Sequence, residues 1–378
     1  MPIPVRTMIF LIIMSGLPAL AIAQSSTLTG ASRSMNPAIS VNGLIRGQAS
    51  RDNPTADLNG FKLDGMEVQF TSVVDPFWKA NFNIGMHPAH SHDGEDDAHA
   101  EGMVVHVEEG YIDGQSLPGG LGLRIGKFAL PFGKHAPLHM HQFPFADAPV
   151  AIASFLGDHI LSDTGAMGTV TVPVPWYADI RLYGVSGEAK PFDVHNKNLA
   201  GGGRLTNLWD VSEDATVELS GSYLHGPDAR HPGESMKVDM YGADLTWKWV
   251  SSARTLGPAL HLTVEALLPD YEEGEGDPWG WYALAQYRFH RNWWAGGGVG
   301  QADAGLDHHE EAPGHEDHDH GLEGDLREYK VNITFAPSEF SALRAEMVYY
   351  QDKVTMEDDL RFIVQANFTI GSHPAHLY

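Results

Sequence analysis

The sequence predicts an all-β fold, namely a transmembrane antiparallel β-barrel of about 16 strands with long extracellular loops and short periplasmic turns. Apolar and polar residues alternate in segments such as 217–223, 260–266, 329–335 and 360–370, whereas a helix would repeat apolar residues at i, i+3 and i+4. Long polar connections alternate with short ones, and aromatic residues gather near the segment ends. Membrane barrels combine these three features. A β-sandwich, the alternative fold, has no reason to alternate its loop lengths.

Each expected strand is a stretch of roughly ten residues with one apolar face. The number of strands is even, as in single-chain bacterial barrels. In chain order the expected strands are 37–49, 62–73, 77–86, 102–113, 121–131, 165–173, 177–186, 200–210, 214–225, 236–250, 257–268, 279–290, 292–301, 324–336, 340–351 and 359–371.

The connections between these strands are of two kinds. Short turns such as 74–76, 174–176 and 337–339 follow even-numbered strands. The long, polar connections follow odd-numbered strands and are 50–61, 87–101, 132–164, 187–199, 226–235, 269–278, 302–323 and 352–358. In an antiparallel barrel this alternation places all long loops at one end.

The N-terminus resembles an export signal. Arg6 gives a positive start, residues 8–20 are apolar, and Ala21-Ile22-Ala23 is a small-residue cleavage site before Gln24. We therefore expect a cleaved signal peptide at 1–23 and a Gram-negative outer-membrane location, an uncleaved anchor being the alternative. A periplasmic segment at 24–36 would precede the barrel at 37–371, in which 132–164 is inserted, and a tail at 372–378 would follow, because Pro374 interrupts strand pairing.

Composition excludes several classes of function. The 378 residues include 24 Lys and Arg against 49 Asp and Glu, a net charge of -25, which argues against nucleic acid as a partner. The absence of Cys excludes disulfides, cysteine-ligated metal clusters and thiol nucleophiles. Because no G-x-S-x-G motif occurs either, we expect no enzyme and no required cofactor. The expected partners are outer-membrane lipid and small ions or solutes.

The connection at 132–164, called here the third loop, is unusually apolar. Its apolar residues include Phe143, Phe145, Ile152 and Phe155, which favour burial over exposure. A barrel of sixteen strands has a lumen too wide for wall side chains to fill, so the loop can fold inward and narrow it. The alternatives for this loop are a lid or a contact between subunits.

Residues 123–133, Leu-Arg-Ile-Gly-Lys-Phe-Ala-Leu-Pro-Phe-Gly, lead into this loop. They resemble the corresponding strand of the phosphate-selective porin O and P family. The segment 123–159 is also similar to a subgroup of outer-membrane porins that carry PFG-K-H, H-x-H, PF-x-D-x-P and FLG motifs. The resemblance implies a sixteen-stranded diffusion channel, a constricting third loop and a homotrimer. Phosphate selectivity does not transfer, because acids outnumber bases twofold. The expected pore-lining residues are Arg124, Asp147, Arg181, Lys330 and Arg361.

Most of the 21 histidines lie in three loops beside acidic residues. Imidazole with carboxylate is the ligand set for zinc or another divalent transition metal when no thiolate is present. Their loose spacing favours several exchanging sites over one structural site. The alternatives are a general or anion-selective porin with incidental histidines, and a non-conducting metal-binding protein. The candidate metal ligands are His87, His90, His92, His99, His135, His139, His141, His308, His309, His315, His318 and His320.

Overall fold

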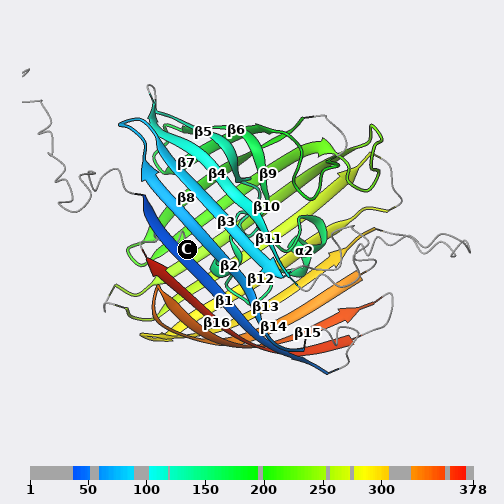
Figure 1. Ribbon diagram of the computed structural model, residues 1–378. Coiled ribbons are helices and arrows are strands. Elements are labelled where there is room, and N and C mark those ends of the chain that lie inside the picture. The colour runs from blue at the N-terminus through cyan, green and yellow to red at the C-terminus, as the bar shows by residue number, and fades with distance from the viewer. Residues whose placement is uncertain are drawn as a thin grey trace, which may run out of the picture. The chain divides into compact units, whose positions relative to one another are not determined.

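The computed structural model describes residues 37–51, 59–88, 102–117, 120–194, 199–252, 256–272, 276–305, 325–353 and 358–371. The described residues from Ala38 onward form one compact unit, which is a closed barrel in which every strand pairs antiparallel with its sequence neighbours (Figure 1). The barrel closes where β1 pairs with β16, from Ser40 opposite Gly371 to Ser50 opposite Arg361. Among the described residues, no helix is long and apolar enough to cross a membrane.

Within the described ranges the barrel contains sixteen strands and encloses two short helices. The helices are η3 (Met140–Gln142) and α2 (Val150–Phe155). The strands are β1 (Ala38–Ser50), β2 (Gly60–Val73), β3 (Lys79–Pro88), β4 (Met103–Leu117), β5 (Leu121–Ala129), β6 (Ser162–Thr171), β7 (Tyr177–Val185), β8 (Ala200–Ser212), β9 (Ala215–Pro227), β10 (Lys237–Val250), β11 (Ala259–Tyr271), β12 (Trp279–His290), β13 (Trp293–Asp303), β14 (Asp325–Ser338), β15 (Ser341–Asp352) and β16 (Asp358–Gly371).

The predicted fold class is confirmed, and each predicted strand corresponds to one observed strand. The largest disagreement at a strand end is in β4, which continues to Leu117 rather than ending at 113. The predicted signal peptide at 1–23, the segment at 24–36 and the tail at 372–378 lie outside the described residues. Those three parts of the domain prediction therefore stay predictions.

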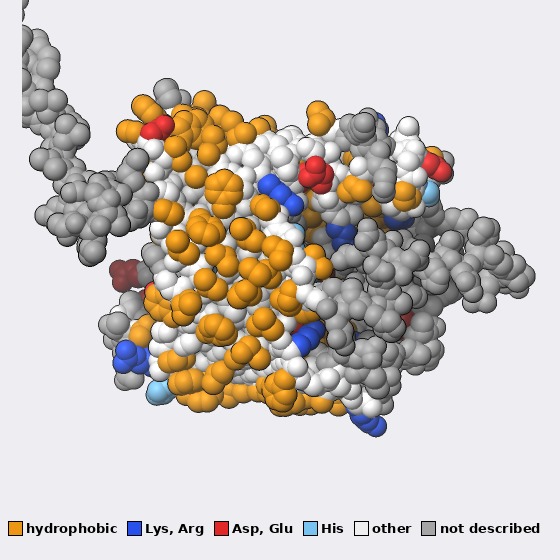
Figure 2. Space-filling model, in the orientation of Figure 1, with side chains coloured by type: hydrophobic (Ala, Val, Ile, Leu, Met, Phe, Trp, Pro, Cys, Tyr) orange, Lys and Arg blue, Asp and Glu red, His pale blue; other side chains and the backbone are white. Residues whose placement is uncertain are grey.

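The outer face of the barrel is apolar and much of the inner face is polar. In β14, Val331 is 59% exposed, whereas Lys330, on the opposite side of the strand, is only 2% exposed. Figure 2 shows apolar side chains covering the face over β1 to β4, where Ile45, Phe82 and Val105 are exposed. An apolar outer face of this kind is suited to contact with lipid. A closed sheet also pairs all of its backbone groups internally, as a lipid environment requires.

The third loop, which spans 130–161 in the structure, lies inside the barrel. Phe132, Phe145 and Ile152 are buried in one apolar cluster with inward side chains of the wall. Helix α2 packs against β11 to β14. The inward prediction is therefore confirmed over a lid or a subunit contact. The third loop packs against an apolar patch of the inner wall that includes Met240 and Tyr282. Strict alternation of apolar and polar residues along the strands did not predict this patch.

Candidate functional site

The N-terminal end of the third loop is attached to the barrel wall by Glu265 of β11. Its Oε2 accepts hydrogen bonds from the backbone N–H groups of Lys134 at 2.9 Å and His135 at 3.3 Å, and from the Tyr282 hydroxyl. Gly133 has a φ of +62°, and a Cβ there would lie 1.8 Å from the Oε1 atom of Glu265. Only glycine fits this close approach between loop and wall.

The middle of the loop is held from the opposite wall by charge. The Nη2 atom of Arg46, in β1, lies 2.6 Å from both carboxylate oxygens of Asp147, and its Nη1 lies 3.4 Å from Asp64 of β2. Burial alone would raise the pKa of the Asp147 carboxyl, but the charges of Arg46 and Lys330 lower it below its usual value. Asp147 is therefore favoured in its ionised form beside Arg46.

Lys330 makes a second attachment a few residues further along the loop. Its Nζ donates to the carbonyl oxygens of Ala148 at 2.9 Å and Asp147 at 3.2 Å, and lies 2.9 Å from Glu328. The other Glu328 oxygen accepts the N–H of Val150, the first residue of α2. Sequence reasoning placed Lys330 on the pore wall, and the structure buries it between that wall and the loop.

The other residues predicted to line the pore are partly exposed and paired with acids. Arg124 lies 3.6 Å from Asp113 and stacks on the Tyr111 ring. Arg181 pairs with Asp179 at 2.7 Å. Arg361 pairs with Asp359 in the same way, two residues away on the same strand face. The inner surface thus carries neutralised pairs at these three arginines rather than an uncompensated positive ladder.

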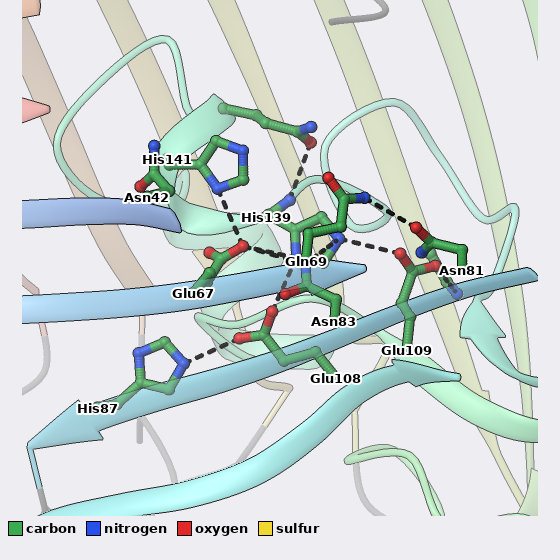
Figure 3. A network of polar contacts seen from close by, with 12 residues as sticks. Asn42, Glu67, Gln69, Asn81, Asn83, His87, Glu108, Glu109, His139 and His141 are labelled. Atoms are coloured by element: carbon green, nitrogen blue, oxygen red, sulfur yellow. Dashed lines mark hydrogen bonds and ion pairs between the residues drawn. The ribbon is translucent and has the colours of Figure 1, made fainter. Parts of the chain in front are cut away.

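Histidines and glutamates form a buried cluster where the third loop meets β2, β3 and β4 (Figure 3). The His139 ring joins two carboxylates, with Nδ1 at 2.8 Å from Glu108 and Nε2 at 3.1 Å from Glu109. His141 Nδ1 lies 3.0 Å from Glu67, and His87 Nε2 lies 2.9 Å from Glu108. Three predicted ligands, His87 from β3 and His139 and His141 from the third loop, therefore come together.

The electrostatics of this cluster follow from its carboxylates. Burial alone would lower the pKa of the His139 imidazole, but Glu67, Glu108 and Glu109 raise it well above its usual value. Asn83 donates to Glu67 at 3.1 Å. Without metal these carboxylates therefore favour the protonated His139 imidazole. A divalent metal would displace that proton and take the same imidazole and carboxylate donors.

A β-bulge in β4 explains the glutamates that sequence reasoning missed. Asn83 pairs with Glu109 and Ile84 pairs with Val107, so Glu108 is an extra residue on its strand. As a result Glu108 and Glu109 are both buried, at 3% and 6% exposure, while Val107 is 46% exposed. Bulges re-aim side chains in this way and are frequent beside functional sites. The adjacent acids, which break the alternation, were the available signal.

The remaining predicted ligands are elsewhere. His135 is buried against Phe143 and Tyr282, with ring centroids 4.4 and 6.2 Å away, and does not join the cluster. Burial and the charge of Lys330 lower the pKa of the His135 imidazole to about 3. The predicted ligands in the two outer loops lie outside the described residues; they are His90, His92, His99, His308, His309, His315, His318 and His320.

Acidification should loosen the third loop through His135. The unfolded chain takes up a proton near the usual pKa of about 6.5, whereas the folded protein does so near 3. This contribution to stability is therefore complete above pH 6.5 and is lost as the pH falls toward 3. We expect a loss of about 2 kcal/mol at pH 5, measured as the free energy of unfolding in urea.

The control is His135→Phe, which keeps an apolar ring in the same space. This variant should lose less stability between pH 7 and pH 5 than the unsubstituted protein. The comparison also separates His135 from His139, whose raised pKa acts with the opposite sign. An identical dependence on pH in both proteins would contradict the prediction.

The chain is similar to several known proteins. No family model matches it. An uncharacterized protein of Aquifex aeolicus is 26% identical over 359 residues, which cover 84% of this chain and 70% of the relative. Its description gives no activity.

Solved structures of outer-membrane proteins share the fold. The anion-selective porin from Comamonas acidovorans has a TM-score of 0.57 at 10% identity, over 89% of this chain and all of that chain. Pseudomonas putida OprB has a TM-score of 0.61 at 9% identity, over 89% and 94%. A trimer form of Vibrio cholerae OmpT has a TM-score of 0.52 at 10% identity, over 89% and 100%. The resemblance to porin barrels is thus confirmed for the fold.

Proposed function

We propose that this protein is an outer-membrane porin, a passive diffusion channel narrowed by its third loop. The observation that carries the proposal is the attachment of that loop inside a closed barrel, through Glu265 on one side and Arg46 and Lys330 on the other. A membrane-spanning tube with a charged internal constriction is suited to admitting small hydrated solutes. We expect export through the predicted signal peptide and no catalytic activity.

Small cations are the solutes that the charge favours. The whole chain carries a net charge of -25, and an acidic surface concentrates cations at a channel mouth. Arg124, Arg181 and Arg361 are each paired with an acid, so they provide little free positive charge for anions. This distinguishes the proposal from the alternative of an anion-selective porin.

We further propose that the outer histidine loops, at 87–101 and 302–323, gather divalent transition metal, with zinc as the first candidate. Their mixture of imidazoles and carboxylates supports weak, exchanging sites. A homotrimer is the proposed assembly, supported by the trimer form of a protein with the same fold. A non-conducting metal-binding barrel is the competing interpretation.

Ion selectivity in a planar bilayer tests this function. We expect the purified protein to form stable channels that prefer potassium over chloride, and micromolar zinc to change their conductance. Replacing the eight outer-loop histidines, from His90 to His320, with alanine should weaken the zinc effect and leave the channels intact, because loops contribute little to barrel stability. A folded barrel without channels would contradict the porin proposal.

A further inference from the structure

The buried cluster contains two sets of possible metal ligands that share one carboxylate. The first set is His87, His106 and Glu108, and the second is Glu67, Glu108 and His139. Within each set the ligand atoms lie within 4.8 Å of one another. The Oε1 atom of Glu108 faces His87 and His106, while its Oε2 faces His139. The shared carboxylate is therefore placed to bridge two centres.

The distances suit small transition-metal ions. A tetrahedral zinc ion with bonds of about 2.0 Å holds its ligand atoms about 3.3 Å apart. In the first set, Oε1 of Glu108 lies 2.9 Å from His87 Nε2 and 3.6 Å from His106 Nε2. In the second set, Nδ1 of His139 lies 2.8 Å from Glu108 and 3.4 Å from Glu67. Both sets are thus arranged at nearly the spacing that a bound ion would impose.

The charge of the cluster calls for a cation. Glu67, Glu108 and Glu109 are all buried. Within the described residues, every ion pair made by these three carboxylates is with a histidine, and none is with Lys or Arg. Buried carboxylates are costly without positive charge nearby. Divalent ions would supply that charge in place of the proton on His139.

Groups around the ligands hold them in the orientation that metal binding needs. His139 turns its Nε2 toward Glu109 at 3.1 Å, which leaves Nδ1 directed at Glu67 and Glu108. Metal-binding histidines commonly have such a carboxylate on the second ring nitrogen. Glu109 is itself fixed by the N–H of Ala129 at 3.0 Å. Glu109 is thus a positioning residue for His139.

A glycine keeps the space open at the first centre. A Cβ at Gly85 would lie 2.3 Å from Glu108 Oε1 and 2.9 Å from His87 Nε2. His106 is half-exposed, whereas His87 and Glu108 are buried, so the first centre is reached past His106. The cluster therefore combines metal ligands, a carboxylate that orients one of them, space and access.

We propose that this cluster is a two-centre site for divalent transition metal, zinc or cobalt, bridged by Glu108. Bound metal would link the third loop, through His139, to β2 and β4 and so hold the constriction in place. The inference deepens the proposed metal capture by adding an internal site to the outer loops. It requires no particular ion selectivity of the channel.

Zinc binding to the metal-stripped, full-length protein tests the site. To separate it from the outer loops, the measurement uses a chain in which the eight outer histidines are alanine. We expect this chain to retain two zinc equivalents by calorimetry and elemental analysis. Adding Glu108→Gln should remove both, His87→Ala with His106→Ala should remove one, and His139→Ala should remove the other.

Two further variants keep the test independent of folding defects. Gly85→Ala retains all ligands and should still lose zinc at the first centre, because its methyl group occupies the site. Glu109→Gln should weaken only the second centre, by about 10–100-fold. Each variant is first checked for heat-resistant migration of the folded barrel.

The matched control is Glu346→Gln. Glu346 is also a buried wall carboxylate that accepts an N–H of the third loop, from Ala146 at 3.0 Å, and it belongs to neither ligand set. This variant should keep both zinc equivalents. Zinc binding that survives Glu108→Gln, or no binding once the outer histidines are removed, would overturn the internal site. If removing the outer histidines alone abolishes zinc binding, the proposed capture of zinc by the outer loops is still supported.

Discussion

Gly133→Ala should release the third loop from the barrel wall. The left-handed conformation costs a non-glycine residue about 1–2 kcal/mol, and the new Cβ would also overlap the Glu265 carboxylate, 1.8 Å away. Glu265 would have to move and give up hydrogen bonds to Lys134, His135 and Tyr282, each of which is worth about 1 kcal/mol. We expect a total loss of about 4 kcal/mol.

The measurements are the free energy of unfolding in urea and the single-channel conductance, which should become larger and noisier as the loop leaves the lumen. Gly233→Ala is the matched control, because Gly233 also has a positive φ, of +81°, but a Cβ there meets nothing within 4 Å. If both variants lose the same small stability and conduct normally, the Glu265 attachment does not hold the loop.

Local pattern was enough to predict the barrel. In a strand such as β14, the polarity of each residue indicates which side of the barrel wall it faces, because Val331 must face lipid and Lys330 must not. The inward third loop was predictable for the same reason, since Phe145 and Ile152 could not remain in water. In both cases the pattern of apolar residues within one segment is enough for the prediction, and the segments that it packs against need not be known.

The buried cluster required information that no local pattern holds. His87 and His139 were recognised as histidines near acids, but their common partner Glu108 faces inward only because of the bulge in β4. Bulge positions depend on the register between two strands, and the approach of His139 depends on how the loop crosses the lumen. The high number of histidines indicated the correct residue type, but only the tertiary structure determines which of these histidines lie in the buried cluster.

His135 shows the opposite case. Its sequence neighbourhood is the same as that of His139, four residues away, yet it packs against Phe143 and Tyr282. The difference arises because the loop passes from an apolar patch of the wall to a polar one within those four residues. Spacing along an irregular loop carries no fixed period, so the two histidines could not be told apart in advance.

Lys330→Met should weaken the attachment of the third loop to β14 and lower the stability of the protein by about 3–5 kcal/mol. The reason is that the substitution leaves Glu328 buried without its cation. The carbonyl oxygens of Asp147 and Ala148 would also lose their donor. The expected result is a lower free energy of unfolding in urea together with unsteady channel conductance. Lys62→Met is the control, because Lys62 is more exposed, pairs with Asp64 at 3.2 Å, and should cost less than about 1 kcal/mol.

The double variant Lys330→Met with Glu328→Gln decides whether that loss comes from the buried ion pair or from the hydrogen bonds to the loop carbonyls. Glutamine removes the uncompensated charge, and its side-chain oxygen can still accept the N–H of Val150. Replacing both members of a buried pair is commonly far less costly than removing one. We therefore expect the double variant to recover more than half of the lost stability and a steady conductance. A double variant no more stable than Lys330→Met would mean that the hydrogen bonds to the loop carbonyls, rather than the buried ion pair, hold the constriction closed.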